Sequence, residues 1–499
     1  MTRAAKRSRT ARRPPPSKSL IDELPDILLV EILCRLPHNK VVYQCKLVSK
    51  RWCSLLSDPY FVGRFLRLQH DQQKPLVHAY AMIPDSRTFL TRDNFSVLTM
   101  SLEPPYSVVD KPISIYSLLP CFQDRFYAHK GEKLVVAGTY NDLVLCSPTE
   151  RSQCDYYICN SYTKEWVRLP PTPRVDEFFV PVGFICDPYY TTKEDGNSSN
   201  NSIIKLNADY RCKVVRLLRN NNNGFYVEIY SSETGEWREY QLSKVLRSQK
   251  NEISFTKIRR CTGVACNGKL YWWNLRGFIF ELDPFNIRST DDNNIIDTCS
   301  FIDAPSVNII YVNKIYAEYK HIGVCQGRLR MCPYWLRVSD PVTIWELKEN
   351  QVNGKPEWRL ICDGVSLSQM VHKPPLVYDQ GLQPQVVGFH PSDGDILYLQ
   401  FPKCTVKCNV SEKTLERATE NPFYEYELCS YKTTYYTHRE SYPSVFPWWP
   451  TPVHKRLHYY DDYNVTVTGE ESEIHIVQDC CGKPARMKRK RKTIAQCRS

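Results

Sequence analysis

Hydrophobic residues follow two different periods along the chain, and the change falls near residue 76. Between residues 20 and 69 they recur with helical spacing. Four short helices are predicted there, over residues 24–37, 41–47, 50–56 and 61–68. Pro25 suits the first helical position, Pro37 ends the first helix, and Ser49 is a good N-cap for the third. Apolar side chains cover well over half of the first helix, so we expect it to contact both its own module and a partner.

After residue 76, short runs of β-patterned sequence alternate with turn signals. A tight turn that leads into a strand recurs five times, at Asn141-Asp142, Asn207-Ala208-Asp209, Asn267-Gly268, Gln326-Gly327 and Asp393-Gly394. Asn, Asp and Gly tolerate the left-handed backbone angles that such turns need. Most of these turns are followed by a strand, a polar turn and a strand that opens with Trp, as at residues 158–166 and 228–237. Each repeat therefore predicts a four-stranded antiparallel sheet.

Radial repetition of such sheets predicts a β-propeller of about six blades over residues 76–480. Residues 76–120 are expected to form a first blade, and residues 423–480 a closing strand or a late blade. The fold class is thus multidomain, with a small all-α module followed by an all-β propeller. A large irregular β-sandwich is the alternative.

The helical segment carries two specific motifs. It reads L-P-D-x-L-x-x-E-I-L-x-R-L-P at Leu24–Pro37 and C-K-x-V-S-K-R-W-x-x-L-L-S-D-P at Cys45–Pro59, followed by Phe61. With these motifs, residues 20–69 resemble the F-box family. The turn His38-Asn39-Lys40 departs from the family, in which this turn is usually apolar or small, and leaves the resemblance intact.

This resemblance implies binding to the Skp-type adaptor, and through it to the cullin, of a ubiquitin ligase. The family's adaptor-contacting or core positions are occupied here by Leu24, Pro25, Ile27, Ile32, Leu33, Leu36, Pro37, Val48 and Trp52. An unrelated three-helix cap, in which the same residues form only a core, is the alternative. The β-patterned region in turn resembles the F-box-associated and kelch-like domains of plant F-box proteins. Together the two resemblances imply a non-catalytic subunit that holds an unknown protein substrate on its propeller.

Charge is concentrated at the two ends of the chain. Residues 1–19 carry seven positive charges and residues 483–499 carry eight, without any acid, whereas the net charge of the whole chain is only +12. The body is therefore near neutral, so nucleic acid is not expected as a partner, and the basic, Pro-rich residues 1–19 are expected to be disordered. The cluster Lys488, Arg489, Lys490, Arg491 and Lys492 is a nuclear-import candidate. We expect the chain in the nucleus, the cytoplasm or both, and an F-box protein that acts outside the ligase as a nuclear interaction factor is the alternative function.

The chemistry-bearing residues form no catalytic or metal motif. The chain has 21 Cys without the spacing of a zinc site and without a signal peptide, so free, buried thiols are expected, and no metal or cofactor. No stretch is long and apolar enough for a membrane span. A propeller enzyme with a Cys nucleophile stays open as a third class. The aromatic segment 442–450 is interpreted as packing against the last blade, with a binding hot spot as the alternative.

Overall fold

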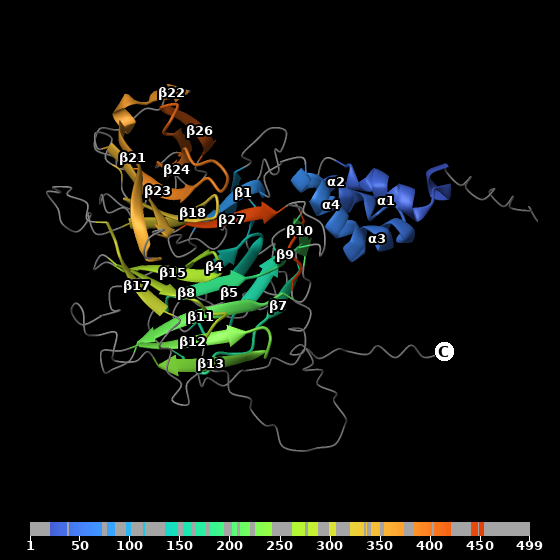
Figure 1. Cartoon of the computed structure of the whole chain (residues 1–499), viewed down its shortest axis with the longest axis horizontal. Helices are drawn as coiled ribbons and strands as arrows, with labels where there is room; N and C mark the ends of the chain where they lie inside the picture. The colour runs from blue at the N-terminus through green and yellow to red at the C-terminus, as the bar shows by residue number, and fades with distance from the viewer. Residues whose placement is uncertain are drawn as a thin grey trace, which may run out of the picture. The chain divides into compact units, whose positions relative to one another are not determined.

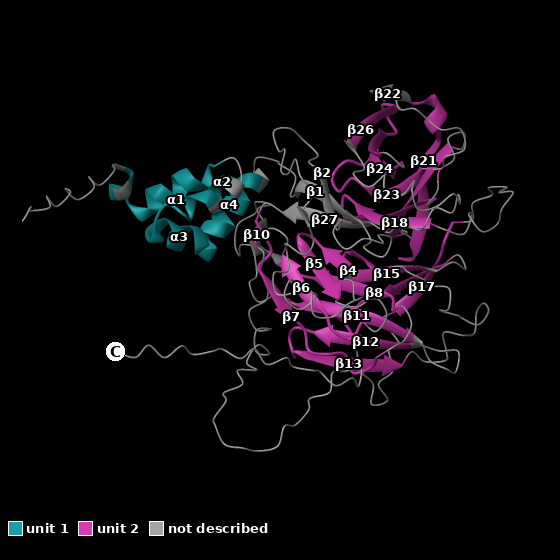
Figure 2. Cartoon of the chain, turned by 180° about the vertical axis from the view of Figure 1, so that it is seen from behind, with its two compact units in different colours: residues 1–74, 191–206 teal, residues 75–190, 207–499 magenta. Residues whose placement is uncertain are grey.

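A computed structural model describes most of the helical segment and the strands of the β-rich region. The described residues are 20–36, 39–71, 77–84, 96–100, 113–114, 135–147, 153–160, 163, 165–175, 180–193, 202–206, 210–219, 225–241, 262–274, 278–287, 299–305, 320–333, 336, 341–349, 354–373, 384–401, 404–420, 441–447 and 449–453. The chain divides into two compact units (Figure 2). The helical unit comprises Met1–Lys74 and Thr191–Leu206, and the propeller unit comprises Pro75–Tyr190 and Asn207–Ser499. Both expected tails, 1–19 and 483–499, lie outside the described residues.

All four predicted helices are present in the helical unit. A 3-10 turn, η1 (Leu20–Glu23), precedes α1 (Asp26–Cys34), α2 (Asn39–Cys45), α3 (Lys50–Ser57) and α4 (Pro59–Asp71). Pro25 occupies the N-cap of α1, one position earlier than predicted. Ser49 caps α3 as predicted, because its hydroxyl accepts a hydrogen bond from the Trp52 backbone N–H at 3.2 Å. The helix α1 ends at Cys34, and Pro37 lies outside the described residues.

The helical unit has a small core to which all four helices contribute. Its buried side chains include Leu29, Leu33, Val42, Trp52, Leu56, Phe61 and Phe65. Polar contacts hold the helices together around this core. Arg51 donates to the Asp26 carboxylate at 2.9 Å, which ties α3 to α1, and Arg64 donates to Glu31 at 2.9 Å, which ties α4 to α1. Hydrogen bonds from Arg35 and Arg64 lower the pKa of Glu31.

The propeller unit consists mainly of five four-stranded sheets and one five-stranded sheet, here called blades 1 to 6 (Figure 1). Blade 1 contains β27 (Ser441–Pro447), β1 (Val77–Pro84), β2 (Ser96–Met100) and β3 (Ile113–Ser114); blade 2 contains β4 (Val135–Tyr140), β5 (Leu143–Ser147), β6 (Tyr157–Asn160) and β7 (Trp166–Arg168); blade 3 contains β8 (Val182–Cys186), β11 (Cys212–Arg219), β12 (Phe225–Ser231) and β13 (Glu236–Gln241). Blade 4 contains β14 (Val264–Cys266), β15 (Lys269–Asn274), β16 (Phe278–Leu282) and β17 (Cys299–Asp303); blade 5 contains β18 (Lys320–Cys325), β19 (Arg328–Pro333), β20 (Pro341–Glu349) and β21 (Pro356–Ser366); blade 6 contains β23 (Gln385–Phe389), β24 (Ile396–Gln400), β25 (Cys404–Asn409) and β26 (Thr414–Glu420). A short 3-10 turn, η5 (Leu367–Gln369), leads from blade 5 to β22 (Val371–Lys373), which adds to β26 in parallel.

The first strand of each blade contacts the first strand of the next. The contacts run from β27 to β4, β8, β14, β18 and β23, and from β23 back to β27. This closed circuit makes the unit a β-propeller rather than a β-sandwich. The predicted fold class, an all-α module followed by an all-β propeller of about six blades, is confirmed.

The two ends of the propeller sequence close the ring together. Strand β27, near the C-terminus, pairs antiparallel with β1, with Val77 opposite Pro447 and Pro84 opposite Ser441. The prediction that residues 423–480 supply a closing strand is therefore confirmed for residues 441–447. Much of the aromatic segment is consequently a strand of blade 1, and this strand also contacts β23 of the last blade, against which the segment was expected to pack.

A second closure follows directly after β27. Thr451 donates its backbone N–H to the buried Asp142 carboxylate at 2.9 Å, and its carbonyl accepts from the Asn160 amide at 2.7 Å. Tyr210 donates its hydroxyl to the carbonyl of Pro452 at 2.8 Å. Residues 449–453 are thereby fastened to blades 2 and 3, and Trp449 is buried.

The turn that recurs in the sequence connects the first and second strands of blades 2, 4, 5 and 6, while the turn expected at residues 207–209 lies outside the described residues. Its leading residue has a left-handed backbone in blades 2, 4 and 5, with φ of 51° at Asn141, 49° at Asn267 and 50° at Gln326. Asn and Gly tolerate these angles, which explains their recurrence there. In blade 1 the first strand comes from the far end of the sequence, so no such turn can exist between β27 and β1.

Blade 3 carries an insertion between its first two strands. The strands β9 (Tyr189–Lys193) and β10 (Ser202–Leu206) form a separate two-stranded sheet. Residues 191–193 belong to β9, and residues 194–201 lie outside the described residues.

Two glycines let neighbouring inner strands approach closely around Trp272. The Trp272 side chain is fully buried, and a Cβ added at Gly183 or Gly263 would lie 2.6 Å from its ring. The Gly263 N–H also donates to the Val182 carbonyl at 2.8 Å, which links blades 3 and 4. Any residue other than glycine at either position would therefore require the Trp272 ring to move.

Buried ion pairs join the second and third strands of blades 3 and 5. Arg216 pairs with Glu228 across β11 and β12, and both side chains are 0% exposed. Arg330 and Glu346 are paired at 3.0 Å in blade 5, with exposed fractions of 6% and 3%. Burial raises the pKa of Glu228, although Arg216 opposes this shift. Loss of either partner would leave a buried charge without compensation.

Candidate functional sites

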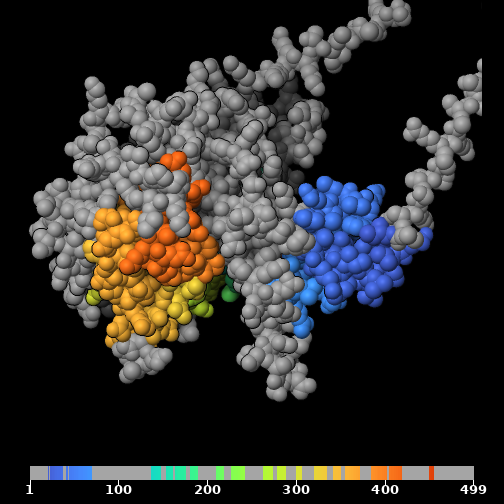
Figure 3. Space-filling model, turned by 90° about the horizontal axis from the view of Figure 1, so that it is seen from above, coloured from blue at the N-terminus to red at the C-terminus, as the bar shows by residue number. Residues whose placement is uncertain are grey.

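The helical unit exposes large apolar side chains that its core does not use. They are Ile21, Ile27, Leu28, Ile32, Leu47, Val48 and Tyr60, here called the exposed apolar set. Leu47 is 88% exposed and Ile27 is 81% exposed, while only three further large apolar residues are exposed among the described residues of the propeller unit. Figure 3 draws the surface of the described helices in blue. Such a concentration of exposed apolar side chains indicates a binding surface.

The helix α1 produces part of this set because it is apolar on two sides. Leu29 and Leu33 are four residues apart and face the core, with exposed fractions of 0% and 2%. Leu28 and Ile32 are also four residues apart and therefore lie along another side of the same helix. Their exposed fractions are 51% and 48%. One side of α1 thus packs the module, and the other is left for a partner.

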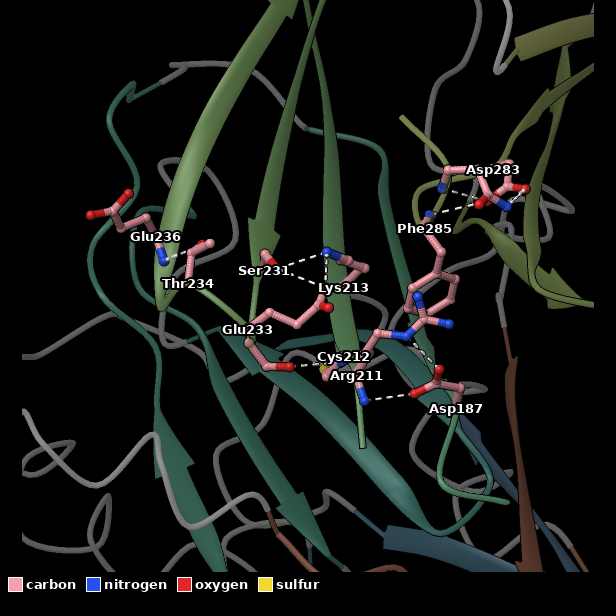
Figure 4. A network of polar contacts seen from close by, with 12 residues as sticks. Asp187, Arg211, Cys212, Lys213, Ser231, Glu233, Thr234, Glu236, Asp283 and Phe285 are labelled. Atoms are coloured by element: carbon pink, nitrogen blue, oxygen red, sulfur yellow. Dashed lines mark hydrogen bonds and ion pairs between the residues drawn. The ribbon is translucent and has the colours of Figure 1, made fainter. Parts of the chain in front are cut away.

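The propeller unit has a polar pocket of about 310 Å³ between blades 2, 3 and 4. Its lining includes Tyr140 at the end of β4, Asp187 after β8, Arg211 before β11, Asn267 in the turn between β14 and β15, and Asp283 and Phe285 after β16. Figure 4 shows several of these side chains together. The pocket therefore lies where the chain turns between strands at one end of three successive blades.

Contacts fix the charged side chains of the pocket. Arg211 donates from Nε to Asp187 at 2.7 Å, and its guanidinium lies over the Phe285 ring at 4.7 Å (Figure 4). The Asp283 carboxylate accepts the backbone N–H groups of Phe285 and Asn286 at 3.0 and 3.1 Å. The arrangement is thus suited to recognising a polar group rather than to binding an apolar ligand.

Several buried thiols and two imidazoles of the propeller unit lie in environments that disfavour their charged forms. Burial raises the pKa of Cys266 and Cys325 to about 11 and that of Cys408 to about 12. Burial also lowers the pKa of His321 and His390 to about 4. A thiol with a raised pKa is a poor nucleophile at neutral pH.

The described part of the chain shows neither a candidate metal centre nor a candidate membrane-spanning helix. No group of three or more His, Cys, Asp and Glu residues there is placed to hold a metal ion. None of the helices seen there combines the length and the apolar character needed to cross a membrane.

Comparison with protein families assigns both regions. An F-box-like family model matches residues 21–67. A model described as the β-propeller of F-box protein At3g26010-like matches residues 107–444, which is more than half of the chain. The chain belongs to this family of F-box β-propeller proteins. Residues 21–67 of the helical unit are accordingly called the F-box below.

Similar proteins come from Arabidopsis thaliana. F-box protein At5g49610 is 26% identical over 256 residues, which cover 50% of this chain and 57% of that protein. F-box protein At3g28330 is 23% identical over 453 residues, which cover 87% of this chain and 97% of that protein. Among solved structures, the crystal structure of Saccharomyces cerevisiae Sqt1 matches 64% of this chain and 84% of that chain, with 7% sequence identity. Its TM-score of 0.27 is too low to establish a common fold.

The nine F-box residues singled out from the sequence have different exposures. Pro25, Ile27, Ile32 and Val48 are exposed, Leu24 and Leu36 are half-buried, Leu33 and Trp52 are buried, and Pro37 lies outside the described residues. The buried pair therefore serves the F-box core. An adaptor role stays a prediction for the exposed and half-buried positions.

Four members of the exposed apolar set were missing from that prediction: Ile21, Leu28, Leu47 and Tyr60. Leu28 had a usable signal, because it stands four residues before Ile32 on the same helix. Leu47 was taken as part of the second helix, whereas α2 ends at Cys45. The import candidates Lys488, Arg489, Lys490, Arg491 and Lys492 lie outside the described residues and stay a prediction.

Proposed function

We propose that this chain is the substrate-recognition subunit of a Skp–cullin–F-box ubiquitin ligase. The F-box binds the Skp-type adaptor, and the propeller holds a protein target. The observation that carries the proposal is the exposed apolar set of the F-box, on a module whose core is already filled. Membership of the F-box family supports the same adaptor as the partner.

Burial of the exposed apolar set supplies the binding energy. Covering one exposed Ile, Leu or Val side chain contributes about 1.5–3 kcal/mol. Ile27 and Leu47 together therefore supply several kcal/mol to an adaptor that covers them. A carboxylate at either position would be desolvated without a partner, which opposes binding.

The propeller contributes proximity rather than bond chemistry. A target held on the same chain as the adaptor has a high effective concentration near the ubiquitin carrier. The raised pKa values of the buried thiols support a non-catalytic role, because thiolate is the reactive form.

A pull-down with a purified Skp-type adaptor tests the proposal. Ile27→Asp should weaken adaptor binding by about 2 kcal/mol, or about 30-fold, without unfolding the module, because Ile27 is 81% exposed. Ile361→Asp, at a 39% exposed position of β21, is the matched control and should bind like the wild type. Trp52 is unsuitable because it is buried. Absence of adaptor binding by the wild-type chain would refute the ligase role.

Localisation is proposed from the basic tail. Residues 483–499, with eight positive charges and no acid, should support import into the nucleus. Deletion of this segment in a fluorescently tagged chain should shift the protein towards the cytoplasm. An unchanged distribution would remove this role for the tail.

A further inference from the structure

We infer that the pocket between blades 2, 3 and 4 binds a carboxylate of the target protein, from a Glu or Asp side chain or a chain terminus. The inference rests on the proposed role of the propeller in holding the target. Its centre is Arg211, which lines the pocket and whose side chain is 46% exposed.

Arg211 is held in one orientation before any ligand arrives. Its Nε donates to Asp187 Oδ2 at 2.7 Å, and its backbone N–H donates to Asp187 Oδ1 at 2.6 Å. The ring of Phe285 supports one face of the guanidinium at 4.7 Å. A guanidinium fixed in this way loses little conformational entropy when it forms a further bond.

The free edge of Arg211 matches a planar acceptor. Within the described part of the chain, its two terminal nitrogens have no hydrogen-bond partner. Terminal guanidinium nitrogens are donors in a fixed fork, and a carboxylate is the group whose two oxygens fit that fork. The strongest unused recognition element of the pocket is therefore a bidentate donor.

The acidic side chains of the pocket are already occupied. Asp187 accepts from Arg211, and Asp283 accepts two backbone N–H groups and the Asn286 amide at 2.7 Å. The Phe285 ring, which could otherwise attract a cation, is covered by Arg211. A cationic ligand would compete for groups that have partners, whereas an anionic one meets two terminal nitrogens of Arg211 that have no hydrogen-bond partner among the described residues.

The local charge favours a carboxylate over a phosphate. The charged side chains in and next to the pocket include two cations and three carboxylates: Arg211, Lys213, Asp187, Glu233 and Asp283 (Figure 4). A phosphoryl group would bring nearly two negative charges into surroundings that are already net negative. A carboxylate brings one, and the pocket of about 310 Å³ has room for one such side chain.

Selection from a random peptide library on the immobilised full-length chain tests this inference. Peptides recovered by the wild type should be enriched in Asp or Glu at one position. Affinity of a recovered peptide should fall about tenfold or more with Arg211→Ala, since a charge-assisted hydrogen bond is lost. Arg238→Ala, at an exposed arginine of β13 in the same blade, is the matched control and should leave affinity unchanged.

A coupling measurement ties the effect to the proposed contact. Replacing the selected Glu by Gln should weaken binding to the wild type, yet have little further effect on Arg211→Ala. Phe285→Leu should weaken binding about threefold, because only the support of the guanidinium is removed. Thermal unfolding of each variant shows whether the propeller is intact.

Three results would overturn the inference: selected peptides without acidic enrichment, unchanged affinity for a folded Arg211→Ala, or tighter binding after Glu is replaced by phosphoserine. The last result would assign the pocket to phosphate. Adaptor binding by the same preparations reports on the F-box separately, so failure of the pocket and failure of the ligase role are distinguishable.

Discussion

The F-box and the propeller treat apolar side chains in opposite ways. The F-box leaves seven large apolar residues exposed, among them Ile27 and Leu47, although its core is small. The propeller unit exposes only Val175, Leu360 and Ile361 among its described residues, and its inner strands contact each other in a closed circuit. In a closed ring every inner strand has a neighbour on both sides, so no inner strand lies exposed at an edge.

This difference locates the two kinds of recognition. A small module that leaves apolar surface exposed binds by burying it, and specificity comes from shape. The propeller presents polar side chains at the turns between its strands, of which Arg211 is an example. On the proposed function, specificity there would come from individual hydrogen bonds and charges.

Breaking the ring should have the largest effect. A chain truncated after residue 440 lacks β27 and residues 449–453, so blade 1 has no inner strand and the Asp142 contact is lost. We expect its propeller to lose the cooperative thermal transition seen by calorimetry, while adaptor binding persists. Truncation after residue 482 retains both closures and should unfold like the full chain. An unaltered transition in the shorter chain would contradict the closure assigned to β27.

Removing one partner of a buried ion pair should destabilise the propeller alone. Arg216→Leu leaves Glu228 buried without its cation and should lower the free energy of unfolding by about 3–5 kcal/mol in urea denaturation. The double variant Arg216→Leu, Glu228→Leu should recover most of this loss. Equal stability of the single variant and the wild type would show that water reaches the pair.

The second closure should make stability depend on pH. Burial raises the pKa of Asp142 to about 6 from the ordinary 3.8, so the folded chain holds this proton more tightly than the unfolded chain. Stability therefore rises as pH falls from about 6 towards 4 and loses this contribution above 6. We compare the free energy of unfolding of the wild type with that of Asp142→Asn by urea denaturation. The wild-type value should rise relative to that of the variant by about 2 kcal/mol when the pH is lowered from 7 to 4.5. A constant difference would contradict the raised pKa.

Thiol labelling should show the smallest effect, without loss of structure. Cys53 is exposed on α3, while burial raises the pKa of Cys34 on α1 to about 12. At pH 8, alkylation followed by peptide mass spectrometry should show that Cys53 is labelled at least about a hundredfold faster than Cys34. Comparable rates would mean that the F-box core opens often.

Contiguous sequence was sufficient wherever structure depends on near neighbours. The F-box helices follow from local spacing and from caps such as Ser49, so all four were predicted with small errors at their ends. The turns Asn141-Asp142 and Asn267-Gly268 allowed the repeated blades to be predicted. A left-handed backbone conformation restricts which residues can occupy such a turn, and this restriction is local.

Long-range contacts escaped the same reasoning. A pairing such as Val77 with Pro447 joins segments that no local pattern connects. The requirement for glycine at positions 183 and 263 could not be predicted either. It arises because the Trp272 ring of blade 4 packs against both Gly183 and Gly263. The pocket unites residues from 140 to 286 that meet only after the blades have packed.

The sequence by itself determined the F-box, the repeated blades and the family resemblance, because helix caps, turn angles and apolar periods act over a few residues. Tertiary structure alone decided which F-box side chains remain exposed, how the ring closes, and that the terminal nitrogens of Arg211 have no hydrogen-bond partner among the described residues. These properties depend on which surfaces other segments cover, and burial is set by packing across the whole chain.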